Sequence, residues 1–525
     1  MSDESTPSGY DATRRTAWQP DLIFVGGRFQ RDLALVTDDA TGRIVSVSQN
    51  NEHDAARVVR LNGRALLPGM TNAHSHAFQR VIRGRTEFRT ATARDTFWTW
   101  REQMYSAASR LTPEQIYDAS RMAFLEMALG GITTVGEFHY LHHNVDGRPY
   151  NDPNLPAKQV VRAARDVGLR IALLRTAYAR SGFNTQTNER QSRFITRDPQ
   201  DFIKHTDALR LDLARESSTR ADDHVDGSQS DQLATAWLGI APHSVRAVPL
   251  PYWREVATYA RAHRMPVHAH VAEQPAEVEA CRVEHGRTPV SLLSEEGLLD
   301  ERFTAVHAIH ITAHEARALA TAHAHVCACP TTERNLGDGI IPADLLFNAG
   351  ARIALGTDSH AQIDLLEDAR ELELNLRLSK LSRAVLAPEE LNEQGDDAGP
   401  DDVSRGNTNR DDVDHDDVDE PPSQISSLAA RLFECATLSG ASSIGADAGA
   451  LERRRAADFF TVALDDPSIA GAGEDDLLAT IIFSLTRAAV RDVIVGGHLV
   501  VENGRHAAQE EIVARFVGLQ RGLWS

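Results

Sequence analysis

Two histidines one residue apart, His74 and His76, have the types and spacing most suited to chemistry. They end an apolar run, and on an extended backbone residues i and i+2 point to the same side. Both imidazoles can therefore reach one divalent cation. Imidazole suits zinc, iron, copper and nickel, so the pair indicates a metal without naming it. Two histidines on a strand are more often packing or surface residues, so the interpretation depends on further ligands.

Those further ligands follow two other apolar segments. Zinc hydrolases need several protein ligands and an open position for water. Asp358 follows a buried-strand pattern, although alone it could equally cap a helix. His270 is favoured over His268 because Glu273 lies three residues beyond it, where a carboxylate could pass a proton to a leaving nitrogen. The predicted metal ligands are His74, His76, His270 and Asp358.

Strand-like segments that alternate with helical patterns must position these side chains. Residues 65–67 are taken as the core of the first strand, and Thr112 with Gln115 predicts the start of a helix over 113–129. Eight strands alternating with helices predict an α/β fold, a (β/α)8 TIM-like barrel, whose active site lies at the carboxyl ends of the strands. The strands are expected to end near His76, Tyr140, Tyr178, His243, Glu273, His310, Glu333 and His360.

The two ends of the chain differ from this central region. Both are rich in strand and turn signals, which predicts a small β-sandwich domain formed by 21–67 and 450–525, beside a barrel over 68–449. Residues 1–20 are expected to be flexible. Two polar stretches, 216–232 and 388–422, are predicted to be disordered insertions because they hold too few large apolar residues to offset the entropy of ordering. The second contains fourteen acidic residues and two arginines.

Composition narrows the functional class. The chain has 525 residues, 42% of them hydrophobic, and a formal net charge of −20. No apolar run is long enough to cross a bilayer, no secretion signal is visible, and no basic footprint for nucleic acid stands out. We therefore expect a cytoplasmic protein without membrane or nucleic-acid partners. The cysteines are too few for a disulfide framework, and the Cys-x-Cys pair is interpreted as part of a buried strand. They are Cys281, Cys327, Cys329 and Cys435.

Seven stretches of the chain together carry a family resemblance. The metal-ligand set identifies only a superfamily, whereas an aromatic Phe-Trp-Thr-Trp-Arg run and a Glu-Phe-His-Tyr-Leu-His-His run are far more specific. The chain resembles the amidohydrolase superfamily in its mononuclear deaminase branch. Within that branch it is similar to the formimidoylglutamate deiminases of histidine degradation, from about Asp21 to the C-terminus. The acidic insertion is not part of the family pattern. The matching stretches are 68–80, 95–102, 135–143, 241–246, 270–274, 329–339 and 356–360.

The resemblance implies a reaction and a set of roles. It implies one divalent metal ion, zinc or alternatively iron, a homodimer, and hydrolysis of N-formimidoyl-L-glutamate to N-formyl-L-glutamate and ammonia. Glu273, His307 and Asp358 would be catalytic. A substrate with two carboxylates calls for guanidinium groups, which pair with carboxylates through two hydrogen bonds. The substrate-binding residues that the family pattern indicates are Gln79, Arg101, Tyr140, His243 and Arg246.

Three alternatives remain open at this point. Another aminohydrolase, acting on a purine, a pyrimidine or a guanidino compound, would share the metal ligands and differ in its pocket. A second variant would cut the other carbon–nitrogen bond and release formamide and glutamate. A non-catalytic barrel kept for binding typically loses metal ligands, whereas His74, His76, His270 and Asp358 are all present here.

Overall fold

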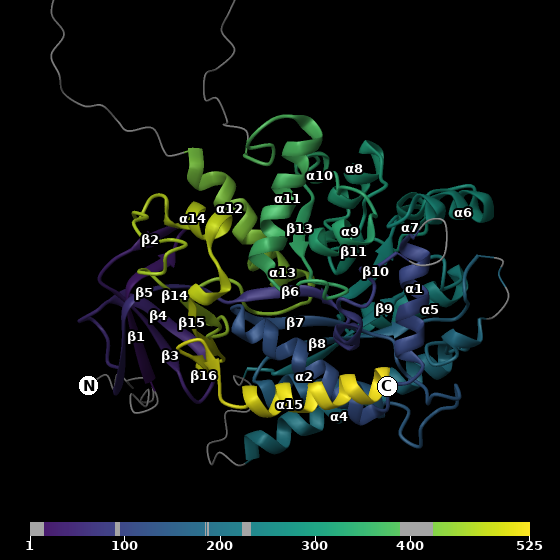
Figure 1. Ribbon diagram of the computed structural model, residues 1–525, viewed down its shortest axis with the longest axis horizontal. Helices are drawn as coiled ribbons and strands as arrows, with labels where there is room; N and C mark the ends of the chain where they lie inside the picture. The colour runs from purple at the N-terminus through teal and green to yellow at the C-terminus, as the bar shows by residue number, and fades with distance from the viewer. Residues whose placement is uncertain (1–14, 90–94, 184, 186–187, 223–232, 389–423) are drawn as a thin grey trace, which may run out of the picture.

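The computed structural model describes residues 15–89, 95–183, 185, 188–222, 233–388 and 424–525. Figure 1 shows two parts. A barrel of parallel strands with surrounding helices occupies the centre and right of the view, and a separate sheet lies at the left. That sheet contains both purple and yellow-green strands, so the two ends of the chain build it together. The predicted barrel with an additional β domain is confirmed.

The barrel strands follow one another in chain order, each parallel to the next. The first and last of them meet at their carboxyl ends, where the Asp358 amide donates to the His74 carbonyl oxygen at 3.0 Å and the His76 amide donates to the Asp358 carbonyl oxygen at 3.1 Å. Among the described residues the strands are β6 (Met70–Ser75), β7 (Ile132–His139), β8 (Arg170–Ala177), β9 (Ala236–Pro242), β10 (Val267–Val271), β11 (Phe303–His307), β12 (His325–Ala328) and β13 (Arg352–Leu355).

Helices between and after the strands cover the barrel. As predicted, Thr112 and Gln115 exchange capping hydrogen bonds at the start of α2. In the described part of the chain the helices are α1 (Phe97–Ala108), α2 (Pro113–Leu129), α3 (Leu155–Val167), α4 (Pro199–Asp222), α5 (Leu250–Ala262), α6 (Pro275–His285), α7 (Pro289–Glu295), α8 (Ala313–Thr321), α9 (Pro330–Leu336), α10 (Ala343–Asn348), α11 (Leu365–Lys380), α12 (Gln424–Ala436), α13 (Leu438–Ser443), α14 (Leu477–Ser484) and α15 (Gln509–Trp524), with short 3-10 helices η2 (Ala77–Ile82), η3 (Glu189–Gln191) and η4 (Arg487–Ala489).

The second sheet is mixed. Its strand β5 pairs parallel to β1 and antiparallel to β14, which joins the N-terminal and C-terminal segments in one hydrogen-bonded layer. Trp18, Leu66 and Phe459 are buried in its core. Its described strands are β1 (Arg15–Val25), β2 (Arg28–Gln30), β3 (Leu33–Asp38), β4 (Arg43–Gln49), β5 (Arg57–Pro68), β14 (Phe459–Ala463), β15 (Val490–Val495), β16 (His498–Glu502) and β17 (Arg505–His506).

The sequence-based choice of first barrel strand was wrong. Residues 65–67 belong to β5 of the second sheet, and the barrel begins with β6. The chain passes from one sheet to the other at Gly69, where an added Cβ would lie 2.4 Å from Oγ1 of Thr133. The apolar run continues across this crossing without a polar turn, so hydrophobicity alone marks no boundary there.

Three segments predicted to lack structure lie wholly or partly outside the described residues. Strand β1 begins at Arg15, inside the predicted flexible N-terminus, because its first residues pair with β3 and β5. Helix α4 runs to Asp222, inside the stretch 216–232. Residues 1–14, 223–232 and 389–423 are not described. Within the described chain, none of the helices has the length and apolar character needed to span a membrane.

Candidate active site

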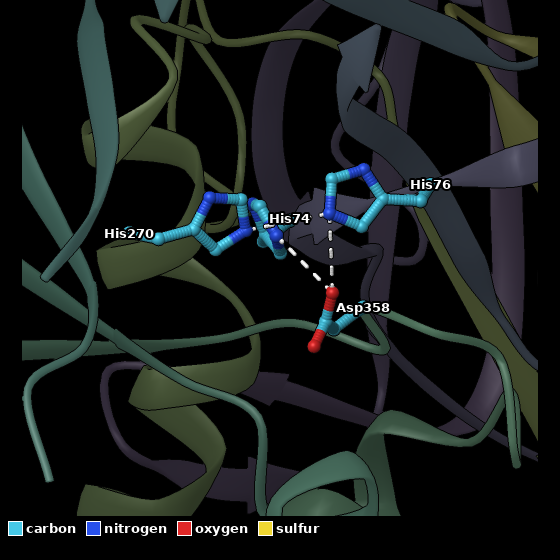
Figure 2. Close-up of side chains that lie close together, drawn as sticks. All are labelled: His74, His76, His270 and Asp358. Atoms are coloured by element: carbon cyan, nitrogen blue, oxygen red, sulfur yellow. Dashed lines mark hydrogen bonds and ion pairs between the residues drawn. The ribbon is translucent and has the colours of Figure 1, made fainter. Parts of the chain in front are cut away.

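Four side chains from three barrel strands and their extensions converge at the carboxyl end of the barrel (Figure 2). His74 lies in β6, His76 follows it directly, His270 lies in β10, and Asp358 comes three residues after β13. Each offers one potential ligand atom, and these atoms all lie within 4.8 Å of one another. All four residues are buried. The structure thus brings together the whole set that the sequence indicated.

The imidazole rings are held so that one nitrogen of each faces the centre. Nδ1 of His76 donates to the Phe138 carbonyl oxygen at 2.9 Å, and Nδ1 of His270 donates to the His243 carbonyl oxygen at 3.1 Å. Their Nε2 atoms are 3.4 Å apart. Hydrogen bonding of one ring nitrogen fixes the tautomer and leaves the other free to bind a metal. Backbone carbonyl groups at the ends of neighbouring strands therefore fix the orientation of both rings.

The donor set and its surroundings fit a divalent cation. Oδ1 of Asp358 lies 3.3 Å from Nε2 of both His74 and His76. Both ring nitrogens of His74 are buried and make no hydrogen bond to the described residues, which is unusual for buried polar atoms. Burial lowers the pKa of His74 to about 3 and also lowers the pKa of His76 and His270. The rings are therefore neutral, the form that binds metals.

A histidine and a glutamate lie beside this group. Nε2 of His307 is 3.6 Å from Oε1 of Glu273 and 3.8 Å from Oδ2 of Asp358. Burial raises the pKa of Glu273 to about 7, although His307 and Arg246 oppose the rise. For His307, burial would lower the pKa, but Glu273 and the other neighbouring carboxylates raise it well above its usual value. A carboxyl group with this pKa can take up or release a proton near neutral pH.

Three residues at this end of the barrel have strained backbone conformations. Ala272, His307 and Asp358 have φ angles of 52°, 72° and 43°, in the left-handed region that residues with a side chain rarely adopt. Such conformations persist only where the surrounding structure enforces them, and they occur often at functional sites. Here they turn the chain sharply after β10, at the end of β11 and after β13, which directs Glu273, His307 and Asp358 inward.

Sequence reasoning placed Glu333 at a strand end, and this was wrong. Strand β12 ends at Ala328, and Glu333 lies in α9, which Pro330 starts. Its Oε1 accepts from the Cys329 amide at 2.9 Å and lies 3.2 Å from Nδ1 of His307. Glu333 thus orients His307, a role that no spacing rule indicated. The expected strand end near His310 also lies earlier, at His307.

Cys329 also lies near the site. With His307 and Asp358 it forms a second group of potential ligand atoms within 4.8 Å of one another, which shares Asp358 with the first. Cys327 and Cys329 are both buried and unbridged, as their interpretation as part of an apolar strand implies.

All five predicted substrate contacts line one pocket with Glu273 and three of the four metal-ligand candidates, His76, His270 and Asp358. Within it, Nε2 of Gln79 donates to the Tyr140 hydroxyl oxygen at 2.9 Å, and the ring of His243 lies 4.8 Å from that of His270. The five are Gln79, Arg101, Tyr140, His243 and Arg246. Sequence reasoning assigned no role to the other pocket residues, which are Phe97, Trp100, Met104, Tyr105, Tyr178, Phe194 and Leu336.

Two guanidinium groups give the pocket its charge. Nε of Arg101, together with Nε and Nη1 of Arg246, is buried and makes no hydrogen bond to the described residues. The Arg101 guanidinium carbon lies 4.4 Å from the centre of the Trp98 ring, and that of Arg246 lies 6.0 Å from it. Buried charged donors without partners carry a large desolvation cost. A bound carboxylate would accept hydrogen bonds from these donors and so offset the desolvation cost.

This barrel, with three histidines and an aspartate clustered at its carboxyl end, defines a metal-dependent hydrolase class. A family model described as the amidohydrolase family matches residues 65–393, and the chain belongs to that family. It is therefore an enzyme, a hydrolase that acts on carbon–nitrogen bonds.

Three comparisons give the family context. The chain is 35% identical over 481 residues to a formimidoylglutamate deiminase of Pseudomonas aeruginosa, covering 91% of this chain and 93% of that one. It is 25% identical to a 5-methylthioadenosine/S-adenosylhomocysteine deaminase of Natronomonas pharaonis, covering 90% and 89%. A crystal structure of an amidohydrolase from Brucella melitensis superposes with a TM-score of 0.81 at 31% identity, covering 97% of this chain and all of that one.

Proposed function

We propose that this enzyme hydrolyses N-formimidoyl-L-glutamate to N-formyl-L-glutamate and ammonia, a step of histidine degradation. The observation that carries the proposal is a set of buried guanidinium N–H donors without partners in the described structure, namely Nε of the half-buried Arg101 and Nε and Nη1 of the buried Arg246. Both arginines line the same pocket as His76, His270 and Asp358. A dianionic substrate suits such a pocket, whereas a neutral heterocycle would leave both charges unpaired. The similarity to the Pseudomonas aeruginosa deiminase supports the same substrate.

In this proposal His74, His76, His270 and Asp358 would hold one divalent cation. That cation would supply Lewis-acid activation of water near neutral pH. Asp358 and His307 would accept or relay a proton from water in the pocket. Glu273, whose pKa is raised to about 7 by burial, takes up a proton and delivers it to the departing nitrogen, so that nitrogen leaves as ammonia. Nε2 of His307 lies 3.6 Å from Oε1 of Glu273, so the charge on each ring or carboxylate influences the other.

The remaining pocket residues position the substrate. Arg101 and Arg246 bind its two carboxylates through charge-assisted hydrogen bonds. Gln79, Tyr140 and His243 line the same pocket and would contact the rest of the substrate. The unpaired Oε1 of Gln79 is available to accept a hydrogen bond from the formimidoyl N–H.

The test is product analysis after incubation of the metal-loaded protein with N-formimidoyl-L-glutamate. Ammonia and N-formylglutamate in equal amounts support the proposal. Formamide and glutamate would show that the other carbon–nitrogen bond is cut. Absence of any turnover, together with ammonia release from a purine or pyrimidine, would favour the alternative aminohydrolase.

Three further properties complete the proposal. We propose zinc as the metal, because three imidazoles and one carboxylate suit it, with iron as the alternative. We also propose a homodimer and a cytoplasmic location, as the family resemblance implies. Metal analysis of protein purified without added metal, light scattering of the eluted protein, and fractionation of the source cells test these three statements.

A further inference from the structure

Two tyrosines of the pocket and a glutamine behind them form a buried trio of polar side chains to which no role has been assigned. Tyr105 lies on α1, Tyr178 directly follows β8, and Gln191 ends η3. All three are at most 2% exposed. Nε2 of Gln191 donates to the hydroxyl oxygen of Tyr105 at 2.5 Å and to that of Tyr178 at 2.8 Å. One amide nitrogen thus holds both phenols beside the proposed substrate pocket.

The proton count of this trio leaves one donor free. A phenol has one proton and can accept two hydrogen bonds. Both N–H groups of Gln191 are used by the two tyrosines. Because the amide nitrogen only donates, at least one of the two phenol protons has to find an acceptor outside the trio, even where one phenol donates to the other. Oε1 of Gln191 is itself buried without a partner in the described structure.

The surroundings show what that acceptor must be. Tyr105 lies one helical turn after Arg101 on α1, and residues four apart share a face of a helix. The Arg101 guanidinium carbon is 5.5 Å from the centre of the Tyr105 ring. Guanidinium groups have no acceptor atoms. A free phenol proton beside a guanidinium group can donate to a bound anion, which the positive charge also attracts.

We propose that Tyr105, held by Gln191 and Tyr178, donates its phenol proton to a substrate carboxylate and helps to select a dicarboxylate. Tyr105 is then a substrate-binding residue, and Gln191 is a positioning residue that acts through it. A carboxylate offers about four lone-pair sites, so it can accept from a phenol as well as from a guanidinium group. This inference rests on the proposed function, because it adds a contact to the same substrate.

The experiment compares four variants of the metal-loaded enzyme with the wild type on N-formimidoyl-L-glutamate. Tyr105→Phe and Gln191→Leu should each raise KM about 10- to 100-fold, the range for loss of a hydrogen bond to a charged group, with kcat nearly unchanged. Gln191→Glu should raise KM further, because a carboxylate would accept the phenol protons and repel the substrate. Tyr117→Phe, which removes a hydroxyl bonded to Asp166 outside the pocket, is the matched control and should leave KM unchanged.

Two substrate analogues make the test specific. N-formimidoyl-L-glutamine and N-formimidoyl-γ-aminobutyrate each lack one of the two carboxylates. With the analogue that lacks the carboxylate contacted by Tyr105, the KM of Tyr105→Phe should equal that of the wild type, because neither protein can make the contact. An unchanged KM in Tyr105→Phe, an equal loss with both analogues, or milder effects of Gln191→Glu than of Gln191→Leu would overturn the inference.

Failure of the proposed function gives a different result. If the wild type does not turn over N-formimidoyl-L-glutamate, the proposed reaction is rejected. The contact between Tyr105 and a carboxylate is then tested by measuring glutarate binding by calorimetry. Weaker glutarate binding by Tyr105→Phe than by the wild type, at equal thermal stability, then supports the carboxylate contact. Equal binding by the two proteins removes it.

Discussion

Replacing Arg246 by methionine should abolish efficient use of a dianionic substrate. Methionine keeps much of the aliphatic length but loses the buried Nε and Nη1 donors, which have no partner in the described structure. Two hydrogen bonds to a charged group contribute about 3–6 kcal/mol together. The value of kcat/KM should therefore fall about 10²- to 10⁴-fold. Arg246→Lys should lose less, because lysine keeps the charge without the two-pronged geometry.

Steady-state ammonia release from N-formimidoyl-L-glutamate measures this effect. Arg515→Met is a suitable control, because Arg515 forms an exposed ion pair with Asp118 at 2.8 Å and such pairs contribute little. Its kcat/KM should stay within about twofold of the wild type. If Arg246→Met also stays within about threefold, Arg246 does not bind a substrate carboxylate and the dianionic substrate loses its main support.

Three further outcomes are expected. Chelation of the metal should lower the melting temperature, and added zinc should restore it, because a ligand that binds only the folded state stabilises it; an unchanged melting temperature would contradict this. Asp458→Ala should lower the free energy of unfolding by about 3–5 kcal/mol in urea titrations, because it leaves Arg170, 2.7 Å away and buried, without its partner; a loss below about 1 kcal/mol would count against it. Glu126 has a lowered pKa: burial raises it, but Arg83 and Arg80 lower it more. The ionised Glu126 therefore stabilises the folded state fully above pH 4.5, and this stabilisation is lost as the pH falls through the folded-state pKa. The difference in free energy of unfolding between the wild type and Glu126→Gln should accordingly shrink at low pH rather than grow.

The sequence predicted the grouping of the four candidate ligands because side chains at strand ends follow simple rules. The i and i+2 spacing of His74 and His76 survives in the structure, and His270 and Asp358 lie where the carboxyl ends of parallel strands must meet. The helix start at Thr112 was equally readable, since its capping box depends on local residues only.

The misassigned elements have local causes. Residues 65–67 and the strand β6 form one apolar run, and only Gly69 separates two different sheets. Glu333 follows a short strand and a proline, and the pattern does not show that the helix begins at Pro330.

The unpredicted residues depend on tertiary contacts. Gln191 reaches Tyr105 and Tyr178 across 86 and 13 residues of chain, and Glu333 reaches His307 across 26. Neither periodicity nor motif spacing predicts such long-range contacts, because they depend on how separate segments pack over the end of the barrel. For Tyr105 a signal existed in the spacing, since it lies four residues after Arg101 and the two share a face of α1.

Metal content measured across single-ligand variants tests the central claim most directly. The account predicts one divalent ion per chain in the wild type, and loss of that ion in His270→Ala and in Asp358→Ala, with the fold retained by circular dichroism. A wild type that binds no metal after loading, or a His270→Ala variant that keeps a full equivalent with unchanged affinity, would contradict convergence of the four side chains on a single cation.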